Sequence, residues 1–263
     1  MLRPRLIAAL LVDAQRHLVK TTAFEQRHYL GDPLNAAYVF SGYEVDELLV
    51  LDIDATPQGR PIPARFVEAL ARFTRVPLTI GGGITSLEQI HDLLALGVEK
   101  VSLSAALTQN LVFLQQAVDR FGSSTISVVL NVQNHGDEQP LAWFGRPNPG
   151  TAGEPLLEIA FACEQAGAGE LVLNSVDRDG SRSGFDVALM ASLNGQLTIP
   201  LVALGGCGNQ THIAELLAAS PLSGVAAGSL FVYAPDTQEV LLNYPHTSSW
   251  LADQLPHLQR AWR

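Results

Sequence analysis

Short apolar segments alternate with helical patterns along the whole chain, and this alternation constrains the fold more than any other feature. Stretches such as SLEQIHDLLALG between the apolar segments repeat their apolar residues every three to four positions. Strands that alternate with helices pair in parallel, because each helix returns the chain to the same edge of the sheet. Eight such units close into a (β/α)8 TIM barrel, an α/β fold. The predicted strands are 6–12, 47–51, 78–81, 100–104, 127–132, 170–174, 201–204 and 224–228.

The two halves of the sequence resemble each other. DELLVLDID at 46–54 matches GELVLNSVD at 169–177, and VPLTIGGG at 76–83 matches IPLVALGG at 199–206, with the same offset of 123 positions. Chance similarity between α/β turns is the alternative, but two blocks in one order favour a two-fold half-barrel repeat. We therefore expect one barrel domain over 1–263. Its expected parts are half-barrels of roughly 1–122 and 123–245 and a C-terminal helical extension over 246–263.

Composition excludes several classes of function. The formal net charge of −10 argues against a nucleic-acid partner, which would need a basic face. The two cysteines and seven histidines show no metal-ligand spacing, so neither a metal nor another cofactor is predicted. The apolar run between Arg5 and Asp13 is too short for a secretory signal or a membrane span. The sequence therefore predicts a cytoplasmic protein without membrane insertion.

Glycine-rich turns follow strands in both halves. Backbone N–H groups in such turns, with a helix N-terminus behind them, suit a phosphate group at the C-terminal face of a barrel. The alternative is that the glycines only permit tight turns. Paired turns in the two halves favour a small-molecule ligand with two phosphate-like ends. The predicted phosphate-binding residues are Gly82, Gly83, Ser104, Gly180, Gly205, Gly206, Gly228 and Ser229.

Four blocks of sequence resemble the HisF family, the cyclase subunit of imidazole glycerol phosphate synthase. They are GDPLNAAYVFSGYEVDELLVLDIDAT, TIGGGI, GAGELVLNSVDRDGSRSG and VAAGSLFVY. The resemblance implies a (β/α)8 barrel of two similar halves. It also implies a HisH-like glutaminase that docks at the N-terminal face and supplies ammonia through the barrel. At the C-terminal face, the ammonia would react with a bisphosphorylated ribulosyl substrate.

The family's two catalytic aspartates are missing, because their positions hold Leu11 and Asn131. Neither side chain can transfer a proton as a carboxylate does. No catalytic residue is therefore assigned, and four other acids remain as candidates. Asp13 also suits a turn. Asp54 and Asp177 are repeat mates, one in each half, and suit either helix caps or a shared site for an amine, an ammonium or a metal. The candidates are Asp13, Asp54, Asp177 and Asp179.

The phosphate turns depart from the family as well. Ser104-Ala105 replaces an Asn-Thr pair, and Leu204 replaces a serine, so fewer side-chain donors remain and the family's substrate need not be the ligand. By contrast, the ring of charges that closes the family's ammonia entrance is complete. The alternative for these residues is ordinary surface charge at strand starts. The ring residues are Arg5, Glu47, Lys100 and Glu170.

A sequence that keeps the ammonia gate but lacks the two cyclase aspartates resembles the WbuZ-type glycosyl amidation proteins. These form a HisF-like branch that is associated with surface polysaccharides. LDIDA at 51–55 and NYP at 243–245 occur there too. The resemblance implies a subunit of a glutamine-dependent amidotransferase assembly that passes ammonia toward a sugar of lipopolysaccharide O-antigen, with a separate sugar amidotransferase as a further partner. There are two alternatives. One is a cyclase of histidine biosynthesis, an enzyme of the lyase class, that uses displaced acids, and the other is a scaffold or regulatory barrel. The Gly- and Pro-rich segment 135–155 is expected to be a mobile flap, with Trp143 and Phe144 available to cover a ligand or to dock a partner.

Overall fold

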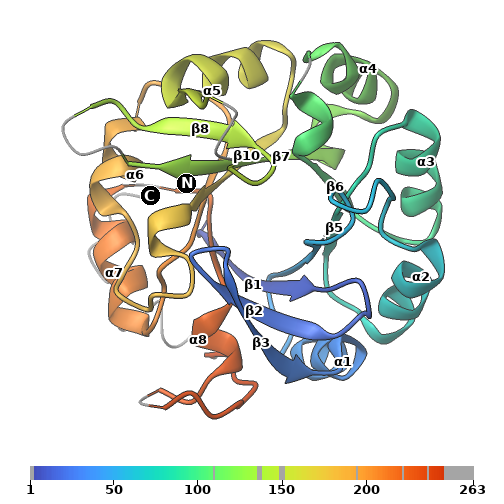
Figure 1. Ribbon diagram of the computed structural model, residues 1–263, viewed down its shortest axis with the longest axis vertical. Helices are drawn as coiled ribbons and strands as arrows, with labels where there is room; N and C mark the ends of the chain where they lie inside the picture. Colours follow the sequence, from blue (N-terminus) through green and yellow to red (C-terminus); the bar gives the residue numbers. More distant parts are fainter. Residues whose placement is uncertain are drawn as a thin grey trace.

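Eight parallel strands form a closed barrel in the computed structural model, which describes residues 3–108, 110–134, 138–147, 152–193, 195–220, 222–235 and 237–245. The pairing runs from β1 through β4, β5, β6, β7, β10, β11 and β12 and returns to β1 (Figure 1). The predicted TIM barrel is confirmed, and each predicted strand overlaps an observed one. The barrel strands are β1 (Arg5–Val12), β4 (Glu47–Asp52), β5 (Leu78–Gly81), β6 (Lys100–Leu103), β7 (Ile126–Gln133), β10 (Glu170–Ser175), β11 (Leu201–Leu204) and β12 (Gly224–Ala227).

Helices surround the barrel and cover its outer face (Figure 1). Local sequence explains where several begin: Asp32, Ser86 and Asn209 each accept a hydrogen bond from a backbone N–H of the first turn. Short 3-10 turns η1 (Ala105–Leu107), η2 (Ser123–Thr125) and η3 (Val176–Arg178) join some elements. The helices are α1 (Pro33–Gly42), α2 (Ala64–Phe73), α3 (Leu87–Ala95), α4 (Val112–Phe121), α5 (Leu156–Gln165), α6 (Val187–Leu193), α7 (Gln210–Ala219) and α8 (Ser229–Val232).

Alternation along the strands divides the buried residues into two cores. Residues that point outward pack against the helices and form the large core. Residues that point inward fill the middle of the barrel with small and branched side chains. This inner core is Ile7, Ala9, Leu49, Val129, Val172, Val202, Leu204 and Ala226. Inward-facing residues before and after these positions must therefore lie at the two ends of the barrel, where polar side chains can reach solvent.

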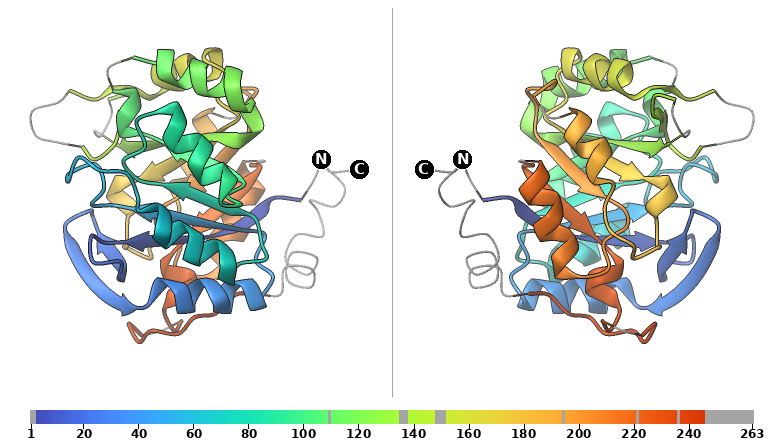
Figure 2. Two further views of the ribbon diagram at one scale, coloured as in Figure 1. Left: turned by 90° about the vertical axis from the view of Figure 1, so that its right-hand side faces the viewer. Right: turned by 90° about the vertical axis from the view of Figure 1, so that its left-hand side faces the viewer.

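Two additional strand pairs extend the barrel at its C-terminal end (Figures 1 and 2). The hairpin of β2 (Leu18–Thr22) and β3 (Gln26–Gly31) continues from β1, and β8 (Leu141–Phe144) pairs antiparallel with β7 and with the short β9 (Glu154–Pro155).

The flap expected over 135–155 is wrong where it crosses β8, because the mainly apolar run LAWF pairs with β7 instead of forming an irregular loop. Parts of that segment, and the helical extension expected over 246–263, lie outside the described residues. None of the helices within the described ranges is long and apolar enough to cross a membrane.

Candidate functional site

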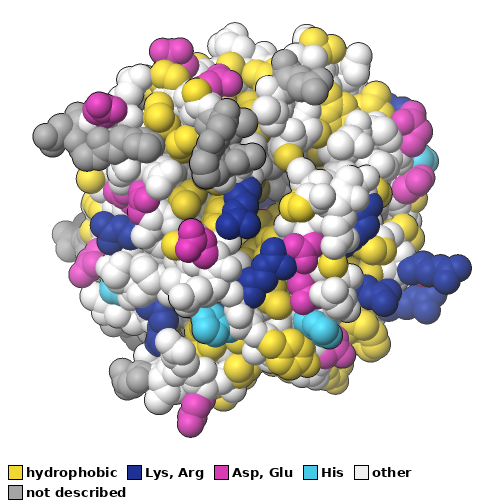
Figure 3. Space-filling view, in the orientation of Figure 1, with side chains coloured by type: hydrophobic (Ala, Val, Ile, Leu, Met, Phe, Trp, Pro, Cys, Tyr) yellow, Lys and Arg dark blue, Asp and Glu magenta, His cyan; other side chains and the backbone are white. Residues whose placement is uncertain are grey.

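A cavity of about 1580 Å³ opens at the C-terminal end of the barrel, and we call it the mouth. Its lining comes from the ends of the barrel strands, from the β2–β3 hairpin and from β8. Figure 3 shows this face, with basic and hydrophobic side chains next to one another near its middle. Lys20, Arg27, Arg60 and Arg146 are the basic residues among the described lining. This volume exceeds that of typical small-molecule pockets, about 300–1,000 Å³, so the mouth can hold a large small-molecule ligand.

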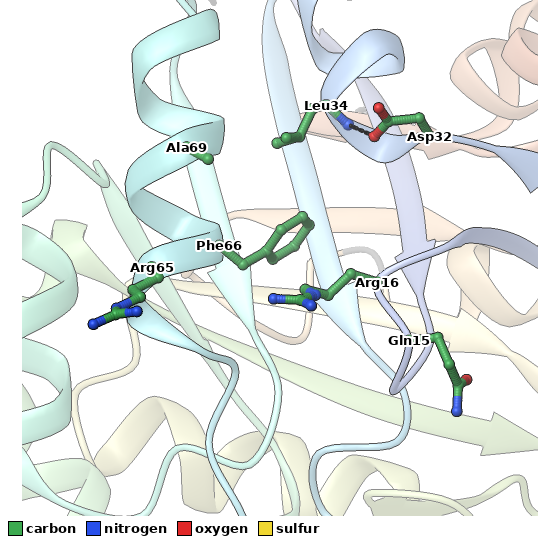
Figure 4. Close-up of a pocket in the computed structure, with 7 residues that line it drawn as sticks. All are labelled: Gln15, Arg16, Asp32, Leu34, Arg65, Phe66 and Ala69. Atoms are coloured by element: carbon green, nitrogen blue, oxygen red, sulfur yellow. Dashed lines mark hydrogen bonds between the residues drawn. The ribbon is translucent and has the colours of Figure 1, made fainter.

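A second, smaller pocket of about 300 Å³ lies outside the mouth and shares no lining residue with it (Figure 4). Asp32 on its wall is already used as the N-cap of α1, where its carboxylate accepts from the Leu34 N–H at 2.8 Å. The arginines Arg16 and Arg65 are exposed there. This pocket has none of the sequence-predicted site residues, so the mouth remains the candidate site.

The floor of the mouth is apolar at the positions that the family resemblance makes important. Leu11 lies near the end of β1, paired with Leu51 of β4, and both line the cavity together with Leu204. No carboxylate of β1 is among the described lining residues of the mouth. The floor can therefore contact an apolar surface of a ligand, but it offers no proton-transfer group there.

Asn131, at the other expected acid position, belongs to a pair of amides. Its Nδ2 donates to the backbone oxygen of Gly145 at 2.6 Å, and its Oδ1 accepts from Nδ2 of Asn174 at 2.9 Å. Asn131 and Asn174 are register partners on the neighbouring strands β7 and β10, and both line the mouth. Asn174 was not singled out from the sequence. Alternate residues of a strand share a face, so Asn174 points inward like Glu170 and Val172 on the same strand. This alternation is the signal in the sequence that could have identified Asn174.

Three of the four candidate acids, Asp13, Asp54 and Asp177, are absent from the described lining of the mouth. Asp13 accepts from the backbone N–H groups of Gln15 and His17 at 2.9 and 2.8 Å, which is the geometry of a turn. Asp177 is exposed and accepts from the Asn134 N–H at 2.8 Å. The turn interpretation of Asp13 fits this geometry.

Asp54 and Asp179 both contact the β2–β3 hairpin. Arg27 donates to both carboxylate oxygens of Asp54, at 2.6 and 2.8 Å, and this contact keeps the pKa of Asp54 below its usual value. Asp179 accepts from the hydroxyl of Thr21 at 2.6 Å and lies 3.9 Å from Nζ of Lys20. Burial lowers the pKa of Lys20, although Asp179 opposes the shift. Both acids are thus engaged in fastening the hairpin over the barrel end.

The repeat mates Asp54 and Asp177 bind different partners, Arg27 and Asn134, and do not form a shared carboxylate site. Among the described residues, no group of three or more histidines, cysteines or acids could hold a metal ion.

The glycine turns are geometrically equivalent in the two halves. A Cβ on Gly83 would lie 1.9 Å from the backbone oxygen of Arg60, and a Cβ on Gly206 would lie 2.1 Å from that of Gly184. Both glycines have positive φ, +63° and +94°, where other residues are strained. Close backbone approach therefore explains why glycine stands at these positions, whether or not a phosphate binds.

Only part of the predicted phosphate set reaches the cavity. Gly82, Gly83 and Ser104 line the mouth; Gly180, Gly205, Gly206, Gly228 and Ser229 are absent from its described lining. The Ser104 hydroxyl is already used, because it donates to the Val129 oxygen and accepts from the Gly145 N–H, each at 2.7 Å. Phosphate binding at these turns stays a prediction.

The four charged residues predicted as a gate form a closed ring at the opposite end of the barrel. Arg5 donates to both Glu47 and Glu170, and Lys100 lies 3.0 Å from Glu47 and 3.7 Å from Glu170. We call this set the charge ring. Thr79 adds a hydrogen bond to Glu47 at 2.6 Å. Every charge in the ring therefore contacts two charges of opposite sign.

The acids of the charge ring are almost fully buried: Glu47 is 3% exposed and Glu170 is 6% exposed. Burial alone would lower the pKa of Arg5, but Glu170 and Glu47 together outweigh it and raise the pKa. Pairing of this kind offsets the desolvation cost at the base of the barrel, where an isolated buried charge would be costly.

Comparisons with known proteins agree with this architecture. Residues 5–237 match the model of the family described as "Histidine biosynthesis protein". A Leptospira borgpetersenii protein, provisionally named imidazole glycerol phosphate synthase subunit HisF, is 37% identical over 94% of this chain and 96% of its own length. The chain belongs to the HisF family. Relatives in this family include a Vibrio vulnificus protein provisionally named subunit hisF3, 39% identical over 94% of this chain and 95% of its own length. A Pseudomonas aeruginosa protein provisionally named subunit hisF2 is 38% identical over 93% of this chain and 97% of its own length.

Proposed function

We propose that this HisF-family barrel accepts ammonia from a HisH-like glutaminase docked at its N-terminal face and releases it at the mouth without performing the cyclase reaction. One contrast carries the proposal: the charge ring is complete, whereas the mouth has Leu11 and Asn131 where the family's acids would stand. An assembly for amidation of a surface-polysaccharide sugar, with a separate sugar amidotransferase, is the proposed destination of the ammonia.

The charge ring supports the ammonia step on physical grounds. Four paired charges at the base of a barrel are retained at a cost in desolvation, and well-packed apolar residues would serve stability as well. A polar ring that can open locally instead suits the passage of a small polar molecule such as ammonia. The apolar inner core lies above it and excludes ions more strongly than a neutral molecule.

The mouth argues against the cyclase reaction. Proton transfer by a positioned acid or base typically contributes about 10²–10⁴-fold to a rate, so the loss of two such groups leaves little turnover. All four candidate substitutes have other partners: Asp13 in a turn, Asp54 with Arg27, Asp177 with the Asn134 N–H, and Asp179 with Thr21. The ligand of the mouth is proposed to be a sugar or a phosphorylated small molecule.

Two assays test the proposal. A HisH-like glutaminase from the same organism should form a stable complex with this protein, and its glutamine hydrolysis should rise when the barrel is added. Lys100→Met, which opens the charge ring, should change that stimulation, whereas the exposed outer substitution Glu68→Gln on α2 should not. Failure to associate, or to stimulate glutamine hydrolysis, would refute the ammonia role.

The competing function is a true cyclase of histidine biosynthesis, and the names of the relatives favour it. The decisive assay uses purified barrel, excess ammonium salt and the ribulosyl bisphosphate substrate, because ammonium removes the need for a glutaminase. No turnover by a folded protein is the expected result. Clear turnover would show that this chain is a cyclase, and its proton-transfer groups would then have to be assigned anew.

A further inference from the structure

A directional chain of hydrogen bonds crosses one side of the mouth. Nδ2 of Asn174 donates to Oδ1 of Asn131 at 2.9 Å, and Nδ2 of Asn131 donates to the backbone oxygen of Gly145 at 2.6 Å. The N–H of Gly145 donates to the Ser104 hydroxyl, which donates in turn to the backbone oxygen of Val129, each at 2.7 Å. Both backbone polar groups of Gly145 are therefore held by side chains of the barrel.

Position 131 needs an amide to take part in this chain of bonds. Gly145 offers a backbone oxygen, so the atom of Asn131 that faces it must be a donor, and the other end of the same side chain accepts from Asn174. An ionised carboxylate only accepts, so an aspartate at this position would set one oxygen against another. Asn131 therefore has a role of its own and is more than a neutral substitute for an acid.

These bonds act at the point where the chain leaves β8. Phe144, the last residue of β8, pairs with Leu130 of β7, and Gly145 follows directly (Figure 1). Gly145 has a φ of +77°, and a Cβ there would lie 3.1 Å from the Cβ of Ala105. The backbone thus bends close against the turn after β6. Holding Gly145 at both its N–H and its oxygen fixes the direction in which the chain continues to Arg146.

We propose that Asn131 and Ser104 form a latch that fixes β8 and the residues after it as one wall of the mouth. Trp143, Phe144 and Arg146 line the mouth from this wall, so the latch sets the position of an aromatic and basic side of the cavity. Asn131 and Ser104 are positioning residues, because they act through the backbone of the wall. The latch is independent of the proposed ammonia role, and its tests need neither a glutaminase nor a ligand.

Asn131→Asp tests the latch, because it keeps the shape of the side chain and removes the donor. Amide hydrogen exchange of Gly145 and of residues 141–144 is followed by mass spectrometry. At neutral pH, exchange should be about tenfold faster than in the wild type, since one lost hydrogen bond corresponds to roughly tenfold in a local opening equilibrium. A protonated carboxyl group can donate again, and burial raises the pKa of a carboxyl group. The ratio of variant to wild type should therefore fall toward one between about pH 8 and about pH 5.

Charges that surround position 131 are the same in the variant and in the wild type. Its register neighbours, Asn174 on β10 and Trp143 on β8, do not titrate. Because exchange is compared at the same pH in both proteins, titration of the unchanged charges cancels in the ratio. The charged residues of β6, β9, β10 and η3, and of the segment after β8, are Lys100, Glu154, Glu170, Asp177, Arg178 and Arg146.

Two variants of Ser104 test the other half of the latch. Ser104→Ala removes the acceptor for the Gly145 N–H and should also raise its exchange rate about tenfold, whereas Ser104→Thr keeps a hydroxyl and should stay near the wild type. Glu68→Gln on the outer face should leave the rate unchanged. Equal exchange in Ser104→Ala and Ser104→Thr, or a ratio for Asn131→Asp that does not change with pH, would overturn the latch. If Asn131→Asp does not fold, the two Ser104 variants decide.

Discussion

Glu47 is the most informative residue for testing the charge ring, because it contacts both cations of the ring. It accepts from Arg5, from Lys100 at 3.0 Å and from Thr79 at 2.6 Å, and it is 3% exposed. Glu47→Gln keeps the shape and removes the negative charge. The substitution leaves Arg5 and Lys100 to share the single acid Glu170.

The expected loss of stability follows from burial and remaining partners. Removing one member of a buried ion pair typically costs about 3–5 kcal/mol. The side chains of Arg5 and Lys100 keep 27% and 17% exposure and still contact Glu170, which reduces the penalty. We therefore expect a loss of about 2–4 kcal/mol in the free energy of unfolding. For a chain of this size, this corresponds to a Tm lower by roughly 5–10 °C.

Thermal and urea unfolding measure this loss directly. Glu68→Gln is the matched control, because Glu68 forms an exposed i, i+4 pair with Arg72 at 2.6 Å, worth about 0.3–0.5 kcal/mol. Adding Lys100→Met to Glu47→Gln should recover part of the stability, since it removes a cation that lost a partner. A Tm for Glu47→Gln equal to that of the control variant would refute the view that the ring charges depend on one another.

Two further predictions concern the barrel end at the mouth. Gly83→Ala should destabilise the protein by several kcal/mol more than Gly59→Ala, because both glycines have similar positive φ but only a Cβ on Gly83 meets a backbone oxygen, that of Arg60; denaturant unfolding of the two variants tests this. Arg27 lowers the pKa of Asp54 below its ordinary value of 3.8, so the ionised pair stabilises the fold above that pH and the contribution disappears as the pH falls through the lower, folded-state value. The Tm difference between wild type and Asp54→Asn should therefore be constant near neutral pH and shrink below about pH 4; a constant difference down to pH 2 would contradict this.

The sequence was sufficient for the barrel strands and insufficient for the added hairpin. Strands such as β4 and β10 are buried on both faces and appear as continuous apolar runs, so their positions are readable. The strand β3, with the sequence QRHYLG, is mostly exposed, and no hydrophobic alternation marks it. Its position depends on pairing with β2 and on the contact between Arg27 and Asp54, which are tertiary facts.

Residue identity was enough to predict the charge ring of the candidate site. Contacts that depend on how neighbouring strands are aligned could not be predicted from the sequence. The residues of the charge ring were found because each matches, in identity and position, a charged residue of the family that the sequence resembles. By contrast, the link between Asn131 and Asn174 requires β7 and β10 to be neighbours with these positions aligned. The roles of the candidate acids were equally hidden, because Asp54 and Asp177 are repeat mates with unrelated partners.

The composition of the charge ring has a consequence for how the predicted halves recognise each other. Glu47 and Glu170 are repeat mates, so each half supplies one acid, whereas Arg5 and Lys100 both come from the first half. Two copies of the first half would bring four cations against two acids, and two copies of the second would bring acids with no cation. Only the unlike pair neutralises the ring. If the halves were produced as separate chains, electrostatics at this end would favour the mixed assembly over either self-association.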